Sequence, residues 1–208
     1  RQDLQEITQL LRSRPVPISG LEYYMTQIMI GDYTQDPELL HQQYNILLSE
    51  LKTRVDQPAG TPGLTSRKPL RLYLMGEETL EFGLFNIIED CGGVLVGCDT
   101  RLSLYYELIK EDGAAIENLA RWIWKMPCNL PTAERIKVTI PYIRKQEPDA
   151  IIVSSVIGSR NLPGAERLVR DIITDELGIP VLSIETRLPL MGIEKVNSQI
   201  KTFIEVHG

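Results

Sequence analysis

The sequence feature that most constrains the fold is an alternation, from residue 70 onward, of short apolar runs with longer amphipathic stretches. The apolar runs predict four strands, at 70–75, 94–97, 150–155 and 180–184. The intervening stretches predict helices, at 79–90, 103–110, 115–125, 132–146, 164–177 and 193–206. Short, nearly all-apolar strands between helices are typical of a parallel sheet covered on both faces. We therefore predict an α/β domain over 70–208, doubly wound around a mostly parallel four-stranded sheet flanked by helices.

The first 55 residues carry helical rather than strand periodicity, so a helical segment over 1–55 precedes the sheet. Ser19 and Glu22 fit a capping box, in which each side chain bonds a free backbone amide at the start of a helix. A further helix begins around Pro37. We expect its apolar side to consist of Leu39, Leu40, Ile46, Leu47 and Leu51.

Residues 56–69, DQPAGTPGLTSRKP, separate these two regions. Proline and glycine interrupt regular structure, so this stretch is expected to be a linker or an exposed loop. The chain begins at Arg1 and enters helix-like sequence at once. We expect the 208 residues to be the helical middle and a sheet domain of a longer subunit, or a naturally shortened relative.

Composition narrows the class of protein. The chain has 28 acidic and 22 basic residues, for a net charge of -6, which argues against a nucleic-acid-binding protein. No apolar run reaches the roughly 18 residues that a membrane span needs, and no apolar stretch follows a basic start as in a signal peptide. Three cysteines do not form a disulfide framework and suit a reducing compartment, so we expect a cytoplasmic location.

In an open α/β sheet, ligands bind beyond the carboxyl ends of the strands, so polar residues that follow each predicted strand are site candidates. Glu77 and Glu78 either complement the dipole of the following helix or face the cleft. Asp99 is either a loop cap or a polar group of the cleft. The loop around Ser159 and Arg160 could hold an anionic group through backbone amides and the guanidinium, but it lacks nucleotide-type glycine spacing.

Several catalytic classes lack their motifs. The sequence has no Walker A motif, no G-x-G-x-x-G after a strand and no G-x-S-x-G, and its two histidines are His41 and His207. The cysteines lack C-x-x-C spacing, which disfavours a zinc site. Cys98 follows a strand and could be buried or face the cleft, whereas Cys128 lies in a proline-flanked loop. A rigid loop cysteine is a candidate metal or cluster ligand, although a single one cannot hold a cluster.

Several segments together resemble the 2-hydroxyacyl-CoA dehydratases and benzoyl-CoA reductases, including the D-component of 2-hydroxyglutaryl-CoA dehydratase. RPVPISG at 14–20 is similar to the R-x-P-P-x-S-G of that family, and IEDCGGVLV at 88–96 to its I-E-E-x-G-G-x-V-V. MPC at 126–128, followed by Arg135, resembles its P-C, and GIPVLSIET at 178–186 resembles its G-I-P-V-L-x-I-E-T. These segments occur in the family's order and cover nearly the whole chain.

The resemblance implies an iron–sulfur cluster held by loop cysteines, an ATP-dependent activator that supplies electrons, and a CoA thioester as substrate. Here Glu77, Arg101 and Ser159 stand where the family has cysteines, whereas Cys128 keeps its place. Oxygen groups match the iron of a sulfide cluster poorly, and a guanidinium has no free lone pair to donate. Cys98, three residues before Arg101, is the substitute ligand that the sequence offers.

Three hypotheses follow. The chain is a dehydratase-like subunit with a degenerate cluster site and a structural or substrate-facing role; or it shares a [4Fe-4S] cluster with a partner; or it is a small-ligand domain for acyl-CoA or a nucleotide, without redox chemistry. The expected partners are a second dehydratase-like subunit, in a homo- or heterodimer, and the activator. The residues assigned are Glu77 and Ser159 for catalysis, Cys128 and Cys98 for metal, and, for the acyl-CoA substrate, Asp99, Arg101, Ser155, Arg160 and Glu185.

Overall fold

A computed structural model describes residues 1–29, 36–56, 64, 68–76, 82–99, 107–158, 165–186 and 193–208. The helices of these segments are α1 (Gln2–Leu10), α2 (Gly20–Ile28), α3 (Pro37–Asp56), α4 (Gly83–Asp90), α5 (Ala115–Trp124), α6 (Thr132–Gln146), α7 (Glu166–Leu177) and α8 (Ile193–His207). A short 3₁₀ helix covers Pro127–Asn129. The strands are β1 (Leu70–Gly76), β2 (Gly93–Cys98), β3 (Ala150–Val156) and β4 (Val181–Thr186).

The four strands form one parallel sheet in the order β2-β1-β3-β4. Nearly every residue of β1, β2 and β3 is buried, which explains why these strands are almost wholly apolar in sequence. The predicted strands and the doubly wound α/β class are therefore confirmed, with strand ends shifted by one or two residues. Among the helices that the structure describes, none is long and apolar enough to cross a membrane.

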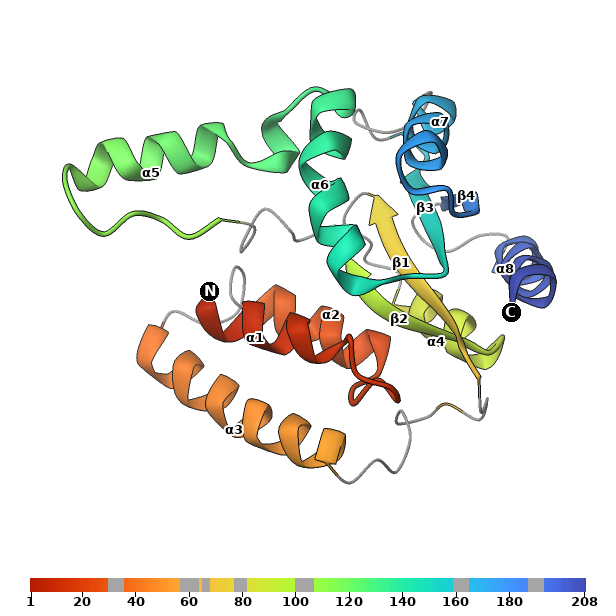
Figure 1. Cartoon of the computed structure of the whole chain (residues 1–208), viewed down its shortest axis with the longest axis horizontal. Helices are drawn as coiled ribbons and strands as arrows, with labels where there is room; N and C mark the ends of the chain where they lie inside the picture. The colour runs from red at the N-terminus through yellow and green to blue at the C-terminus, as the bar shows by residue number, and fades with distance from the viewer. Residues whose placement is uncertain are drawn as a thin grey trace.

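Helices cover both faces of the sheet (Figure 1). On one face α6 and α7 pack around a cluster that includes Tyr73, Met75 and Val153. On the other face α2, α4 and α8 pack over Leu72, Leu74 and the apolar residues beside them. Such two-sided coverage leaves the ends of the strands as the place where polar side chains can gather.

The N-terminal helices share the second of these clusters with the sheet. Ile7 of α1, Tyr24 of α2 and Leu51 of α3 belong to the same hydrophobic cluster as Leu72 of β1. Most of the stretch at 56–69 lies outside the described residues, so the predicted division at this stretch stays a prediction.

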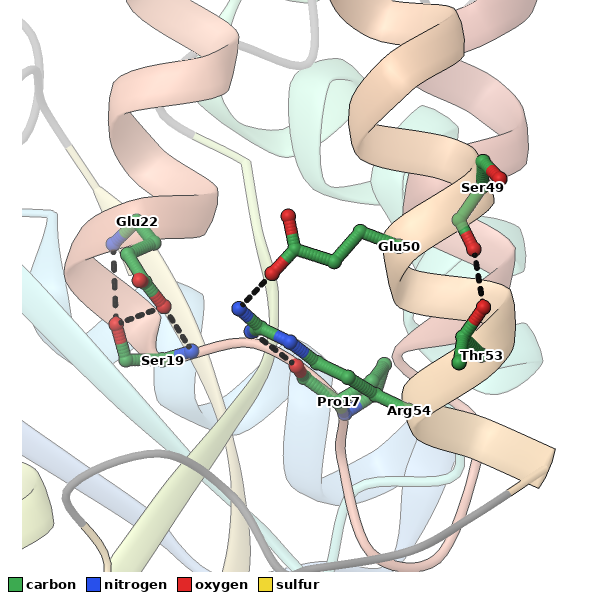
Figure 2. A network of polar contacts seen from close by, with 7 residues as sticks. All are labelled: Pro17, Ser19, Glu22, Ser49, Glu50, Thr53 and Arg54. Atoms are coloured by element: carbon green, nitrogen blue, oxygen red, sulfur yellow. Dashed lines mark hydrogen bonds and ion pairs between the residues drawn. The ribbon is translucent and has the colours of Figure 1, made fainter.

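Polar contacts fix the last turns of α3 to the chain segment before α2 (Figure 2). Arg54 donates a hydrogen bond to the carbonyl oxygen of Pro17 at 3.0 Å and pairs with Glu50. The predicted capping box of α2 is present, because the Ser19 hydroxyl accepts from the Glu22 amide at 3.3 Å and the Glu22 carboxylate accepts from the Ser19 amide at 3.0 Å. The helix start that the sequence indicated is therefore confirmed.

Two helix predictions were wrong in part. Residues 107–110 of the helix expected at 103–110 are not helical, and the rest of it lies outside the described residues. Carbonyl groups of this stretch accept bonds from α5 instead: Trp122 Nε1 donates to Glu107 at 2.7 Å, and Asn118 Nδ2 to Lys110 at 3.1 Å. In α3, Leu39 and Ile46 are 47% and 63% exposed, so they do not lie on its buried side.

The buried face of α3 is instead formed by residues at a regular helical spacing. Its members are Leu40, Tyr44, Leu48 and Leu51. Tyr44 can be part of this buried face because its hydroxyl donates a hydrogen bond to the carbonyl oxygen of Thr26 at 2.5 Å. Its one polar atom is therefore paired although the side chain is buried. The pattern of leucines and isoleucines alone could not show this.

Candidate functional site

The carboxyl ends of the parallel strands meet at one edge of the sheet, where the sequence predicts the site. The described site candidates at this edge are Cys98 at the end of β2, Asp99 directly after it, Ser155 on β3 and Glu185 on β4. Four other candidates lie outside the described residues. They are Glu77, Arg101, Ser159 and Arg160.

Asp99 ties the tips of β1 and β2 together. Its carboxylate accepts from the backbone amide of Gly76 at 2.7 Å and from Nη2 of Arg135 at 3.1 Å. The same Arg135 nitrogen also donates to the carbonyl oxygen of Gly76 at 2.6 Å. The Asp99 side chain is 1% exposed and that of Arg135 12%. Burial raises the pKa of Asp99, against the charge of Arg135 and the Gly76 hydrogen bond, which lower it.

Gly76 permits this arrangement because it has no side chain. Its φ is +150°, and a Cβ built there would lie 2.1 Å from the carbonyl oxygen of Ser154 on β3. Any other residue would force β1 and β3 apart at their tips. Asp99, Gly76 and Arg135 therefore form one fixed unit, which we call the β1–β2 tip lock.

The serines of β3 lie beside this lock. Ser154 pairs in register with Gly76, and among the described residues its buried hydroxyl has no hydrogen-bond partner. Ser155 is buried and pairs in register with Glu185, which is exposed. The sheet thus brings together two of the predicted substrate-binding residues, Ser155 and Glu185, next to a serine that the sequence analysis did not single out.

The two predicted metal ligands have opposite environments. Cys98 is fully buried, and with Thr8, Tyr73 and Gln146 it lines a cavity of about 30 Å³ between the first helices, the sheet and α6. Cys128 is exposed in the 3₁₀ helix. Within the described residues no three His, Cys, Asp or Glu side chains come together as a metal-binding group. These residues do not fit an iron–sulfur cluster held by this part of the chain alone.

The side chains of Thr8 and Tyr23 also line the cavity at Cys98. The hydroxyls of Thr8 and Tyr23 lie 3.1 Å apart. Burial raises the pKa of Tyr73 well above its ordinary value, so this phenol stays protonated. A Cβ on Gly97 would lie 2.5 Å from the Tyr73 ring, so the glycine makes room for that ring.

Two of the family-like segments contact each other directly. The backbone amide of Gly20, in RPVPISG, donates to Oε1 of Glu89, in IEDCGGVLV, at 2.6 Å. Glu89 thereby satisfies a free amide at the start of α2, in addition to the Ser19 cap. Burial raises the pKa of Glu89, although the Gly20 hydrogen bond opposes this.

The sequence analysis assigned no role to Arg71 or Arg135, which both hold elements in place. Arg71 is buried at 4% exposure, and Nη2 of Arg71 donates to the carbonyl oxygens of Gln146 at 2.9 Å and Leu11 at 3.3 Å. The signal for Arg71 was a charged residue within an otherwise apolar strand, because such a residue needs buried partners. For Arg135 the signal was only its place after the P-C pair.

These features define a class: a doubly wound α/β protein with an N-terminal helical segment and a polar carboxyl edge closed at β1 and β2 by a buried ion pair. The sequence pattern of the family described as 2-hydroxyglutaryl-CoA dehydratase, D-component, matches residues 1–206. The chain therefore belongs to this family. No curated protein matches the chain significantly.

Proposed function

We propose that this chain is a dehydratase-like subunit whose own cluster site is degenerate and whose role is structural or substrate-facing. The observation that carries the proposal is the contrast between the two candidate thiols. Cys98 is fully buried beside Thr8, Tyr73 and Gln146, whereas Cys128 is the one exposed cysteine among the described residues. One accessible thiol supplies too few ligands for a [4Fe-4S] cluster, which takes four thiolates.

The proposal implies partners. A second dehydratase-like subunit would carry the cluster or supply its missing ligands, and an ATP-dependent activator would deliver electrons to that cluster. The polar edge of this chain would then face the acyl-CoA substrate. Ser155 and Glu185 would contribute there together with residues outside the described segments, namely Glu77, Arg101, Ser159 and Arg160.

Metal analysis tests the degenerate site directly. The chain is purified without oxygen, and iron, sulfide and cluster absorbance are measured for the wild type and for Cys128→Ala. We expect iron and sulfide far below four atoms of each per chain, with little effect of the substitution. A stoichiometric cluster that disappears in Cys128→Ala would refute the proposal.

Cys91 supplies a matched control for this experiment. It is half-buried, away from the sheet edge, and its Sγ donates to Asn197 at 3.3 Å. Iron lost equally from Cys91→Ala and Cys128→Ala is bound non-specifically and leaves the proposal standing. Iron that depends on Cys128 only when the second subunit is present would favour the hypothesis of a shared cluster instead.

A second candidate function is binding of a small ligand, acyl-CoA or nucleotide, without redox chemistry. The unpartnered buried hydroxyl of Ser154 favours it, because a buried polar group without a partner is rare and often marks a binding position. A thermal-shift screen separates the candidates. Stabilisation by acyl-CoA, with none by nucleotides, supports the dehydratase-like function. Stabilisation by nucleotides that Ser154→Ala reduces supports the alternative.

A further inference from the structure

The cavity at Cys98 lies between elements that are far apart in the sequence. Residues of α1, α2, β1, β2 and α6 line it, and its volume is about 30 Å³. Its buried polar residues are Tyr23, Tyr73, Cys98 and Gln146. A cavity needs about 10–15 Å³ to hold one water molecule, so this cavity has the space for one.

The chemistry of its walls decides whether such a space is dry. Cavities lined by leucine, isoleucine and phenylalanine stay empty, whereas water enters a polar cavity in which two to four groups can bond it. Among the described residues that line this cavity there is no such apolar side chain, and phenol, hydroxyl, thiol and amide groups surround the space instead. The walls therefore suit a water molecule.

The phenol of Tyr73 is the group that needs a partner in this cavity. Its side chain is buried, and burial raises its pKa well above the ordinary value, so the hydroxyl keeps its hydrogen. The groups that act on it electrostatically are Asp99, Tyr23, Cys98 and Arg135, and none of them accepts a hydrogen bond from it. A buried donor without an acceptor is costly, and a water oxygen in the cavity would accept this hydrogen.

The hydroxyl of Tyr23 supplies an acceptor for the water. Thr8 donates its one hydroxyl hydrogen to the carbonyl oxygen of Leu4 at 2.7 Å. In the 3.1 Å contact between the hydroxyls of Thr8 and Tyr23, the donor is therefore Tyr23. Its phenol oxygen still has a lone pair with which to accept a hydrogen bond from a water molecule.

The cavity also has a route to solvent. Two of its lining residues on α6 are less buried than the rest: Tyr142 is half-buried and Lys145 is exposed. Nζ of Lys145 lies 5.6 Å from the centre of the Tyr142 ring. The cavity thus reaches the surface beside these two side chains, so water can enter and leave without unfolding of the sheet.

We propose that the cavity at Cys98 binds one water molecule, which accepts a hydrogen bond from the Tyr73 hydroxyl and donates one to the Tyr23 oxygen. This water joins β1 to α2, so the N-terminal helices are attached to the sheet partly through a bridging water. The inference concerns the junction of these elements and does not depend on the proposed function.

Two measurements on the 208-residue chain test the site directly. A crystal structure at high resolution should show an ordered water about 2.5–3.0 Å from the Tyr73 hydroxyl oxygen. In solution, oxygen-17 magnetic relaxation dispersion counts the waters that stay bound for longer than the protein takes to tumble. Tyr73→Phe removes the donor with little change of shape, and it should lower this count by one.

Tyr44→Phe is the matched control. Tyr44 is also 2% exposed, but its hydroxyl donates directly to the carbonyl oxygen of Thr26 at 2.5 Å. Both variants lose a satisfied hydroxyl, so each should lower the melting temperature by roughly 2–4 °C. Only Tyr73→Phe should change the number of long-lived waters.

The direction of the Tyr73→Phe effect separates a wet cavity from a dry one. In a dry cavity the hydroxyl has no acceptor, so its removal should raise the melting temperature. A rise in melting temperature, an unchanged water count in Tyr73→Phe, or a wild-type crystal structure with an empty cavity would each overturn the proposal. The wild-type crystal structure keeps the test decisive even if Tyr73→Phe does not fold.

Discussion

Arg71 offers the sharpest test of how the N-terminal helices are joined to the sheet. Its guanidinium donates to carbonyl oxygens at two helix ends: Gln146 at 2.9 Å and Glu147 at 3.2 Å after α6, and Leu11 at 3.3 Å and Ser13 at 3.4 Å after α1. The last carbonyls of a helix lack partners within the helix and carry negative partial charge. One buried cation therefore neutralises two helix ends at once.

Arg71→Met retains the length of the side chain and removes every donor. A hydrogen bond to a charged donor contributes about 1.5–3 kcal/mol, and the two shorter bonds, to Gln146 and Glu147, are expected to dominate. Leaving the buried acceptors without a donor adds to the cost, so we expect a loss of about 3–5 kcal/mol in the free energy of unfolding. Arg71→Lys retains the charge but cannot span both helix ends, and should lose about 2 kcal/mol.

Urea unfolding followed by far-ultraviolet circular dichroism measures both variants. Arg144→Met is the matched control, because Nη2 of Arg144 also donates to a carbonyl at the end of a helix, that of Glu176 at 2.9 Å, but its side chain is 56% exposed. The control should lose less than about 1 kcal/mol. If Arg71→Met unfolds within about 1 kcal/mol of the wild type, the buried guanidinium does not join the two helix ends as argued.

Two further predictions concern the carboxyl edge and the start of α2. Gly76→Ala should lower the free energy of unfolding by more than about 3 kcal/mol or prevent folding, because its Cβ would lie 2.1 Å from the Ser154 carbonyl oxygen. The same urea assay measures this, and a loss below about 1 kcal/mol would contradict the packing at the β1–β2 tip lock. Because burial raises the pKa of Glu89, its contribution to stability is present below about pH 4.5 and is lost as pH rises through the folded pKa. Glu89→Gln keeps an acceptor for the Gly20 amide and has no carboxyl group to ionise, so its stability should not fall with pH in this way. The free energy of unfolding of the variant minus that of the wild type should therefore grow with pH. A constant or falling difference would contradict the conclusion that burial raises the pKa of Glu89.

The sheet could be predicted because its signal is local. Each strand is a short apolar run, and coverage on both faces leaves no alternation to confuse the pattern. The failures arose where long-range contacts outweigh local pattern. Residues 107–110 have helix-compatible sequence, yet their environment is set by bonds from Trp122 and Asn118 on α5. The sequence of a segment does not state which later side chain will bond its carbonyls.

The edge of the sheet was predictable as a place but not as an arrangement. The rule that ligands bind beyond the carboxyl ends of the strands located Asp99, but it left open whether Asp99 caps a loop or faces a cleft. The answer depends on Arg135, which lies 36 residues further along the chain and reaches the tip from α6. It depends equally on the close approach of Gly76 to Ser154, which only the register of β1 and β3 defines.

The contacts between family-like segments show which residues of the family sequence pattern stabilise the fold. Gly20 and Glu89 bond across 69 positions of sequence and fix the start of α2 against α4. Asp99, Gly76 and Arg135 fix the tips of β1 and β2. None of these contacts needs a cluster, because each is complete within the protein. A chain can therefore keep the family pattern over residues 1–206 while the cysteines change, provided that these framing residues stay. This reasoning predicts that Arg135→Met lowers the stability of the isolated chain far more than Cys128→Ala does, since Arg135 serves the fold and Cys128 is exposed on the surface.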